Sequence, residues 1–136
     1  MRVMLEPGAF QPTRAHSKDA GLDIRSMYTQ VVPARGYAVF HTGVHVELPP
    51  NTAGMIKSKS GLNVRNDIVT TGVIDEGYTG CIVIKLYNLG KNDYYVSAGD
   101  KIAQLVVVSI PHVDVEIVPS ISGGERGNAG FGSTGK

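Results

Sequence analysis

The sequence predicts an all-β fold, a sandwich or barrel of short strands, and three observations carry this prediction. Apolar residues come in short runs, many with a period of two, as in strands with one buried face. Prolines and glycines separate the runs, which is typical of turns between strands. No window carries a long helical period, so the 136 residues are expected to form one β-domain.

Four runs define the expected strands most clearly. Residues 44–48 alternate, with the two valines and the leucine pointing inward. Residues 81–87 alternate in the same way, with isoleucines and a leucine on one face. Residues 102–110 are apolar enough for burial on both faces, and residues 113–118 alternate against two acidic side chains.

One segment departs from this pattern and predicts a short helix within residues 58–66. Ser60 suits an N-cap, because its hydroxyl can accept a hydrogen bond from the backbone of the first turn. Leu62 is expected to point into the core, and Asn66 is expected to end the helix.

Composition and charge restrict the class of function. Hydrophobic residues make up 42% of the chain, so a globular fold is expected rather than disorder. The formal net charge of +1 gives no basis for duplex DNA or an acidic membrane surface as the main partner. Cys81 is the single cysteine, so a reducing compartment is expected. Residues 1–8 lack the apolar run of a signal peptide, and no stretch approaches the roughly 20 apolar residues of a spanning helix, so we expect a cytoplasmic protein.

The C-terminal residues predict a separate, mobile arm. Residues 120–136 contain only two large apolar side chains, so we divide the chain into a domain of residues 1–119 and an arm of residues 120–136. The glycines of the arm allow its backbone to approach an anion closely, and Arg126 offers a forked guanidinium for phosphate. Phe131, set between glycines, is placed to fold over a flat ring. A merely solubilising tail explains these residues about equally well.

Residues 72–80 predict a tight hairpin that carries a carboxylate. Glycines lie at both ends, and the exposed backbone groups of such a turn can pair with the edge of a planar base. Asp75 follows two apolar residues, so it is the candidate to orient and deprotonate a water molecule. Tyr78 is placed to stack under a sugar. The alternative is an ordinary turn in which Asp75 caps its own backbone.

Three further segments carry groups suited to a phosphorylated ligand. Residues 58–61 combine hydroxyls, Lys59 and a helix start, which is a common phosphate site, although simple capping explains them equally well. Asp19 and Asp23 flank a predicted strand and offer oxygens for Mg²⁺-bound waters, with a turn role favoured for Asp19. Gln104 is polar inside an apolar run, so it must bond either to a buried group or to phosphate.

The other candidates for metal or nucleophilic chemistry lack the spacing that such sites need. The four histidines are scattered without a His-x-x-x-His pair, so they are expected to be non-catalytic. Cys81 has no Cys-x-x-Cys partner and is expected to pack as a small apolar side chain.

Taken in order, five segments resemble the five motifs of the trimeric dUTPase family. They are residues 20–24 (AGLDI), 59–62 (KSGL), 72–78 (GVIDEGY), 99–105 (GDKIAQL) and 126–135 (RGNAGFGSTG). A single motif would be a weak signal, but five in the right order span nearly the whole chain at family-like spacing.

This resemblance implies an all-β, jelly-roll-like distorted β-barrel of the β-clip type that forms a homotrimer, with each active site drawing on all three chains. It implies Mg²⁺-dependent hydrolysis of dUTP to dUMP and pyrophosphate, which keeps uracil out of DNA and supplies dUMP for dTMP synthesis. It also implies a cytoplasmic enzyme of bacterial or phage origin, with no membrane and no direct nucleic-acid partner.

The resemblance also assigns roles to residues of this chain. Asp75 is implied as the general base, with Mg²⁺ held by the substrate triphosphate and, through water, by Asp23. The base and sugar are implied to contact Thr71, Gly72, Val73, Ile74, Tyr78 and, from the arm, Phe131. The phosphates are implied to contact Lys59, Ser60, Gly61, Gln104, Arg126, Gly132 and Ser133.

The chain departs from the family pattern at a few positions. Lys59 replaces the usual arginine, so a bidentate phosphate contact is lost there. Asn128 and Ala129 stand where a second pair of glycines is common, and Gly77 stands where an aspartate is common. None of these changes removes the implied base.

Two other functions fit parts of the sequence. A dCTP deaminase, alone or bifunctional, shares the fold and would use a glutamate. Glu76 is the nearest candidate, but as the neighbour of Asp75 it should point to the opposite side of a strand, and the C-terminal arm argues against this function. A regulatory, protein-binding module of dUTPase type is the alternative from another class, although no large insertion separates the motifs.

Overall fold

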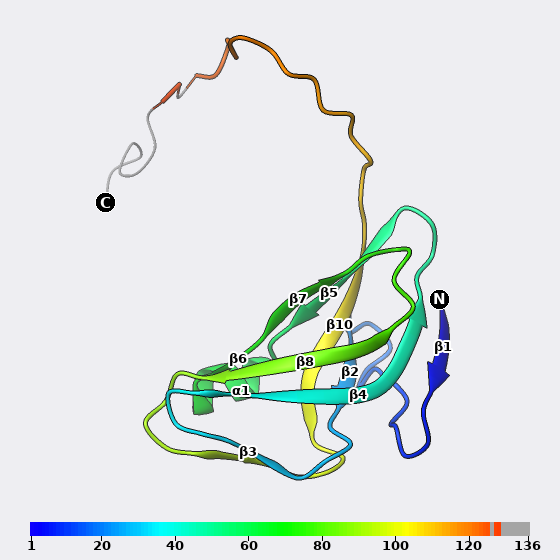
Figure 1. Cartoon of the computed structure of the whole chain (residues 1–136), viewed down its shortest axis with the longest axis vertical. Coiled ribbons are helices and arrows are strands. Elements are labelled where there is room, and N and C mark those ends of the chain that lie inside the picture. The colour runs from blue at the N-terminus through cyan, green and yellow to red at the C-terminus, as the bar shows by residue number, and fades with distance from the viewer. Residues whose placement is uncertain (126, 129–136) are drawn as a thin grey trace.

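The computed structural model describes residues 1–125 and 127–128, and this part of the chain is almost entirely β-structure with one short helix (Figure 1). The elements in chain order are β1 (Arg2–Leu5), β2 (Gly21–Arg25), β3 (Gln30–Val32), β4 (Tyr37–Glu47), β5 (Thr52–Lys57), α1 (Ser60–Asn66), β6 (Ile68–Val69), β7 (Thr71–Ile74), β8 (Cys81–Asn88), β9 (Tyr94–Val96) and β10 (Lys101–Ser109). The prediction of an all-β fold with one short helix is confirmed.

The strands form two four-stranded sheets and a two-stranded ribbon. The first sheet has the order β1-β4-β8-β6 and the second has the order β2-β10-β5-β7, while β3 pairs with β9. All of these pairings are antiparallel. In the described residues the sheets do not close into one continuous barrel, and they instead share a single core between them.

The alternating runs place their apolar side chains as the sequence predicts. In β8 the isoleucines, Leu86 and Asn88 are buried, while the intervening residues are partly or fully exposed. In β4 the valines at 44 and 46 are fully or almost fully buried, and His45 between them faces outward. Phe40 and Ile24 are among the largest fully buried side chains, so both sheets contribute to the core.

Helix α1 begins one residue away from the predicted arrangement. Lys59 occupies the N-cap position in an extended conformation, and the cap has no side-chain hydrogen bond, so the predicted capping role of Ser60 is wrong. Leu62 packs against the core as predicted, and this tertiary contact stabilises a helix too short to be stable alone. Asp67 ends the helix in the left-handed conformation and donates its N–H to Asn63 O at 3.0 Å. In the described part of the chain no helix has the length and apolar character needed to span a membrane.

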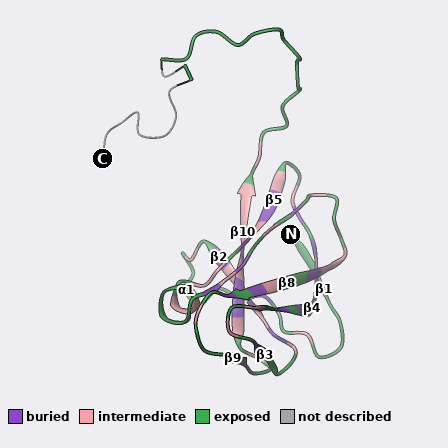
Figure 2. Ribbon diagram, turned by 60° about the vertical axis from the view of Figure 1, so that its left-hand side comes forward, coloured by how far each residue is buried: buried purple, intermediate pink, exposed green. Residues whose placement is uncertain are grey.

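The chain leaves the body of the molecule after β10 (Figures 1 and 2). All residues from 111 to 125 are exposed, and Ile117 is 95% accessible. The alternating run 113–118 therefore does not form a strand here, because no strand among residues 1–125 and 127–128 lies beside it to complete the hydrogen bonds. The prediction of two-sided burial holds only for the first half of β10, since residues 106–108 are half-buried.

Candidate active site

Three of the predicted segments meet on the outer face of the second sheet. Gln104 of β10 lies opposite Asp23 of β2 on one side and Lys57 of β5 on the other, and Lys57 lies opposite Thr71 of β7. Because side chains alternate between the faces of a sheet, this row points away from the core that Leu105 and its neighbours fill. The register thus gathers residues that are far apart in the sequence.

Gln104 is held in place by a small neighbour and a backbone carbonyl. Its side-chain amide donates a hydrogen bond to Ser58 O at 3.0 Å. A Cβ atom added to Gly21 would lie 2.5 Å from Gln104 Oε1, so the glycine makes room for the amide to lie across β2. Ser58 is fixed in turn, because its hydroxyl donates to Thr70 O at 3.0 Å and accepts from Thr70 N at 2.8 Å.

Asp23 lies between two ammonium groups. It is 6% exposed, its Oδ1 pairs with the Lys59 ammonium, and its Oδ2 lies 2.6 Å from Lys101 Nζ. Burial acts to raise the pKa of Asp23, but hydrogen bonds and charge from Lys101 and Lys59 outweigh it and hold the pKa below its usual value. Two cations share one carboxylate, so the cluster keeps a net positive charge that suits an anionic ligand.

Asp23 is also the residue predicted to contact Mg²⁺-bound waters. In this structure each of its carboxylate oxygens accepts from one lysine. Lys101 was not among the predicted site residues. A β-bulge between Lys101 and Ala103 brings its side chain to Asp23, and a bulge of this kind leaves no clear trace in a sequence.

The start of α1 adds a second basic group that sequence reasoning missed. The guanidinium of Arg65 folds back over Gly61, so that a Cβ there would lie 2.8 Å from Arg65 Nη2. The i,i+4 spacing on one helix face explains this approach and is the signal that could have identified Arg65. Ser60 is exposed at the helix start, and Lys59 precedes it.

Residues 72–80, predicted as a tight β-hairpin, instead form the connection from β7 of the second sheet to β8 of the first. The two strands do not pair with each other, so the prediction of a paired hairpin is wrong, and we keep the name hairpin only for this turn segment. Asp75 is exposed directly after β7, and its carbonyl accepts the N–H of Tyr78 at 3.0 Å, which closes the turn. The Tyr78 hydroxyl donates to Cys81 O at 3.0 Å, and its ring lies against Gly80, where a Cβ would come within 2.9 Å of Tyr78 Cε2. The ring is therefore held along this segment, and the residue remains 44% exposed.

Glu76 is directed away from Asp75. Its Oε2 accepts a hydrogen bond from the backbone N–H of Asn51 at 2.8 Å and lies 3.8 Å from His112 Nε2. These contacts tie Glu76 to the loop before β5 and bring it near His112, which follows β10. Of the two adjacent carboxylates, only Asp75 stands clear at the turn.

The cross-strand row and the two lysines that pair with Asp23 together form a basic row, which consists of Asp23, Lys57, Lys59, Thr71, Lys101 and Gln104. The hairpin and the basic row lie at opposite ends of β7 (Figure 1). Thr71 belongs to the row, and Asp75 is four residues further, about 13 Å along an extended chain. One chain thus brings together Asp23, Lys59, Gln104 and Thr71 but keeps Asp75 and Tyr78 apart from them. Four predicted residues lie outside the described part of the chain: Arg126, Phe131, Gly132 and Ser133.

Comparison with known proteins points to one family. A model described as dUTPase matches residues 9–135. The deoxyuridine 5'-triphosphate nucleotidohydrolase of Gloeothece citriformis is 42% identical over 134 residues, covering 96% of this chain and 92% of that protein. The structure of the Staphylococcus bacteriophage 80alpha dUTPase with dUPNHPP has a TM-score of 0.89 at 34% identity, covering 99% of this chain and 98% of that one. A mutant dUTPase from phage phi11 of S. aureus, which reveals the coordination of a structural Mg(II) ion, has a TM-score of 0.81 at 31% identity, covering 88% of this chain and 96% of that one.

Proposed function

Because this chain belongs to the dUTPase family, we propose that it hydrolyses dUTP to dUMP and pyrophosphate with Asp75 as the general base. The activity follows from the family, whose match spans nearly the whole chain, and it makes the protein a dUTP diphosphatase. One observation supports the residue roles. The exposed carboxylate of Asp75 stands on the hairpin, apart from the basic row, which has a net positive charge.

The basic row binds the triphosphate. Lys59 and Gln104 contact phosphate oxygens, and the backbone N–H groups of Ser60 and Gly61, free at the start of the helix, add two further donors. Arg65 lies over Gly61 and supplies the forked guanidinium that Lys59 lacks. Arg126, Gly132 and Ser133 of the arm complete the phosphate contacts.

The hairpin binds the nucleoside. Backbone groups of residues 71–74 pair with the edge of uracil, and Tyr78 packs against the deoxyribose. A ribose 2′-hydroxyl has no room against that ring, and cytosine presents the wrong pattern of donors and acceptors. Phe131 covers the uracil from the arm.

Asp75 performs the chemical step. Its carboxylate takes a proton from a water molecule whose oxygen attacks the α-phosphorus in line. The bond between the α-phosphorus and the bridging oxygen breaks, and pyrophosphate leaves with that electron pair. Closure of the arm excludes bulk water during this step.

Magnesium belongs with the substrate in this proposal. The described site presents lysines, an amide and backbone donors, and the carboxylate of Asp23 is already engaged by two lysines. This set of groups fits an ion that is held by the triphosphate oxygens, where it neutralises phosphate charge. Each Asp23 oxygen accepts one lysine donor and keeps a second lone pair, with which it can accept from a water of that ion.

The active site is shared between the chains of a homotrimer. Asp75 and the basic row of one chain are about 13 Å apart along β7, and a nucleophile must lie close to the α-phosphorus. Pairing the hairpin of one chain with the basic row of another removes this separation. The exposed segment 111–125 leaves the body of the chain (Figure 1), and in this proposal the arm that follows it closes over the site of a neighbouring subunit.

Two alternatives are distinguished from this function. A dCTP deaminase would need Glu76 as its catalytic glutamate beside the nucleobase, but the Glu76 carboxylate accepts a hydrogen bond from Asn51 N at 2.8 Å. A regulatory role has one specific observation in its favour, the similarity to the phage 80alpha enzyme, one of the phage dUTPases that control transfer of virulence genes by a proto-oncogenic G protein-like mechanism.

The test is release of pyrophosphate from dUTP, dCTP, dTTP and UTP with Mg²⁺, for the wild type, Asp75→Asn and Glu76→Gln. We expect turnover of dUTP alone, a loss of about 10²–10⁴-fold in kcat for Asp75→Asn, and near wild-type rates for Glu76→Gln. Ammonia release from dCTP would establish the deaminase. Binding of dUTP without turnover in the wild type would favour the regulatory role.

A further inference from the structure

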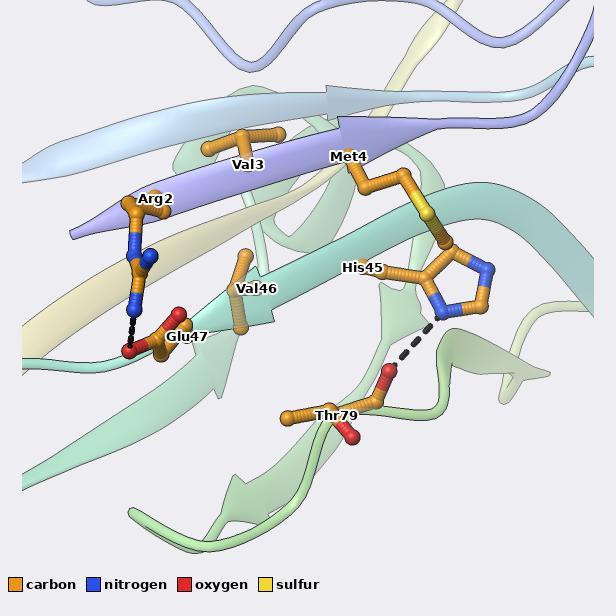
Figure 3. A pocket seen from close by; sticks show the side chains of 7 residues that line it. All are labelled: Arg2, Val3, Met4, His45, Val46, Glu47 and Thr79. Atoms are coloured by element: carbon orange, nitrogen blue, oxygen red, sulfur yellow. Dashed lines mark hydrogen bonds and ion pairs between the residues drawn. The ribbon is translucent and has the colours of Figure 1, made fainter.

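A second group of reactive side chains lies on the first sheet, away from the proposed active site. It borders a hollow of about 330 Å³ that runs along β1 and β4 and ends at Thr79 of the hairpin (Figure 3). His45 lines this hollow, and it forms a group with Glu6 and Cys81, whose ligand atoms and that of His45 all lie within 4.8 Å of one another. None of the three has a role in the proposed hydrolysis.

The hydrogen bonds of His45 fix how its ring presents itself. Its Nδ1 lies 2.9 Å from Thr79 O, and because a carbonyl can only accept, Nδ1 carries a proton. Its Nε2 lies 2.9 Å from Glu6 Oε1. With Nδ1 protonated, the Nε2 lone pair of a neutral ring would face the carboxylate, so either a proton on Nε2, which makes an ion pair with Glu6, or a metal ion lies between the two atoms.

Cys81 completes the group through the strand register. His45 of β4 lies directly opposite Cys81 of β8, and both side chains point to the outer face. His41 of β4 lies opposite Val83 of β8, whereas His45 lies opposite Cys81. Between these two pairs β4 covers four residues and β8 only two, and this register shift places His45 beside Cys81. Gly43 permits the irregularity with a φ of +65°.

We propose that Glu6, His45 and Cys81 bind a divalent cation of the Zn²⁺ type, with water as the fourth ligand. Thiolate, imidazole and carboxylate together match Zn²⁺, whereas Mg²⁺ and Ca²⁺ select oxygen ligands. The bond from Nδ1 to Thr79 O is the outer-shell contact that orients a metal-binding histidine.

The site needs only small adjustments to accept the ion. Tetrahedral Zn²⁺ places its N and O ligands at about 2.0–2.2 Å, so the two atoms stand about 3.3 Å apart. The pair of His45 Nε2 and Glu6 Oε1, now at 2.9 Å, opens slightly, and a rotation about the Cα–Cβ bond of Cys81 brings its sulfur inward. That sulfur makes only a long contact of 3.5 Å to Ile82 O at present, which little resists the rotation.

Binding would brace the substrate hairpin from behind. Thr79 O accepts from His45, and Cys81 O accepts from the Tyr78 hydroxyl, so both residues that join the hairpin to β8 contact this group. An ion there would tie the end of β1, through Glu6, to the base of the hairpin. The inference does not depend on the hydrolytic roles of Asp75 and the basic row.

The experiment is titration of the purified full-length protein, reduced and free of chelator, with Co²⁺ and then Zn²⁺. We expect one Co²⁺ per chain, a thiolate-to-cobalt charge-transfer absorption with tetrahedral d–d bands, and displacement of both by Zn²⁺ but not by Mg²⁺. Cys81→Ser should abolish the charge-transfer band, and Glu6→Gln should weaken binding by at least about tenfold. The matched control is His41→Asn, an exposed histidine on the same strand, which should bind as the wild type does.

Circular dichroism checks the fold of each variant, and the Cys81 and Glu6 variants carry the test if His45→Asn does not fold. A rise in the thermal midpoint with Zn²⁺ in the wild type and not in Cys81→Ser would support the site independently of the spectrum. The proposal is overturned if Co²⁺ gives no thiolate band, or if all variants bind Co²⁺ equally.

Discussion

The amide of Gln104 occupies the space above Gly21, where a Cβ atom would stand 2.5 Å from Oε1 and 3.0 Å from Gln104 Cβ. The second distance involves the base of the side chain rather than its flexible end. A larger residue at position 21 must therefore move the whole Gln104 side chain or shift β2 away from β10. The geometry of the basic row therefore depends on Gly21, a residue to which no ligand contact is assigned.

Gly21→Ala should raise the KM for dUTP more than it lowers kcat. A hydrogen bond to a charged phosphate contributes about 1.5–3 kcal/mol, so displacing Gln104 should raise KM by at least about tenfold. Steady-state kinetics measures this. Gly77→Ala is the matched control, because a Cβ there meets nothing within 4 Å, and equal effects of the two substitutions would contradict the assignment.

Gly80→Ala should weaken the discrimination between dUTP and UTP. The added Cβ would lie 2.5 Å from the Tyr78 hydroxyl oxygen, so the ring must move from the position in which we propose that it packs against the sugar. We expect a smaller ratio of kcat/KM for dUTP over UTP, by about tenfold or more, since that ratio depends on a close steric fit. A variant with unchanged selectivity would show that Tyr78 does not set it.

Asp23→Asn should lower stability at neutral pH and flatten its dependence on acid. The pKa of Asp23 is lowered in the folded state, so its stabilising contribution is present above the unfolded value of about 3.9 and is lost as pH falls through the folded pKa. Because the two lysines keep 29% and 33% of their side chains exposed, we expect a loss of only about 1–3 kcal/mol at neutral pH.

Urea unfolding between neutral and acid pH measures the effect of Asp23→Asn. The wild type should lose this contribution on the acid side, and the variant should not. Asp114→Asn, at an exposed position of the segment that leaves the body, should leave the curve unchanged. Parallel acid curves for wild type and Asp23→Asn would exclude Asp23 as the source.

Thr70→Val should be neutral or stabilising by about 1 kcal/mol in the absence of nucleotide. The Thr70 hydroxyl oxygen is buried without a hydrogen-bond partner among the described residues, so its removal relieves a desolvation cost. Thr42→Val is the matched contrast and should destabilise by about 1–2 kcal/mol, because Thr42 Oγ1 donates to Ile82 O at 2.7 Å. The free energies of unfolding of both variants in urea decide, and equal changes would refute the distinction.

The fold was predictable where one chain supplies all of the packing. The alternation in β4 and β8 reports a buried and an open face, and both faces are as predicted. The same pattern predicted a strand at residues 113–118, and this prediction was wrong. Alternation shows that a segment has an apolar face, but it does not show where a partner strand lies. The prediction of Ser60 as the N-cap of α1 was wrong, because Lys59 occupies that position with an extended backbone and without a side-chain hydrogen bond.

The site was predictable in its segments and not in its cross-strand contacts. Motif positions identified Asp75, Lys59 and Gln104, whose roles remain proposals. The pairing of Asp23 with Lys101 depends on a β-bulge, and the pairing of His45 with Cys81 depends on a register shift, so neither follows from spacing along the chain. Scattered histidines and a single cysteine were therefore interpreted as non-catalytic and packing residues.

Because residues 111–125 are exposed, we expect their ordering to depend on the protein concentration. Among the described residues their valines and isoleucines are exposed, four of the five by 76% or more, so we expect that burying them requires another molecule. Burial that requires a second molecule obeys mass action, and dilution removes it while the core between the two sheets persists. A dilute preparation would then keep a folded body with a detached arm, and its rate per chain would fall before any unfolding signal changes.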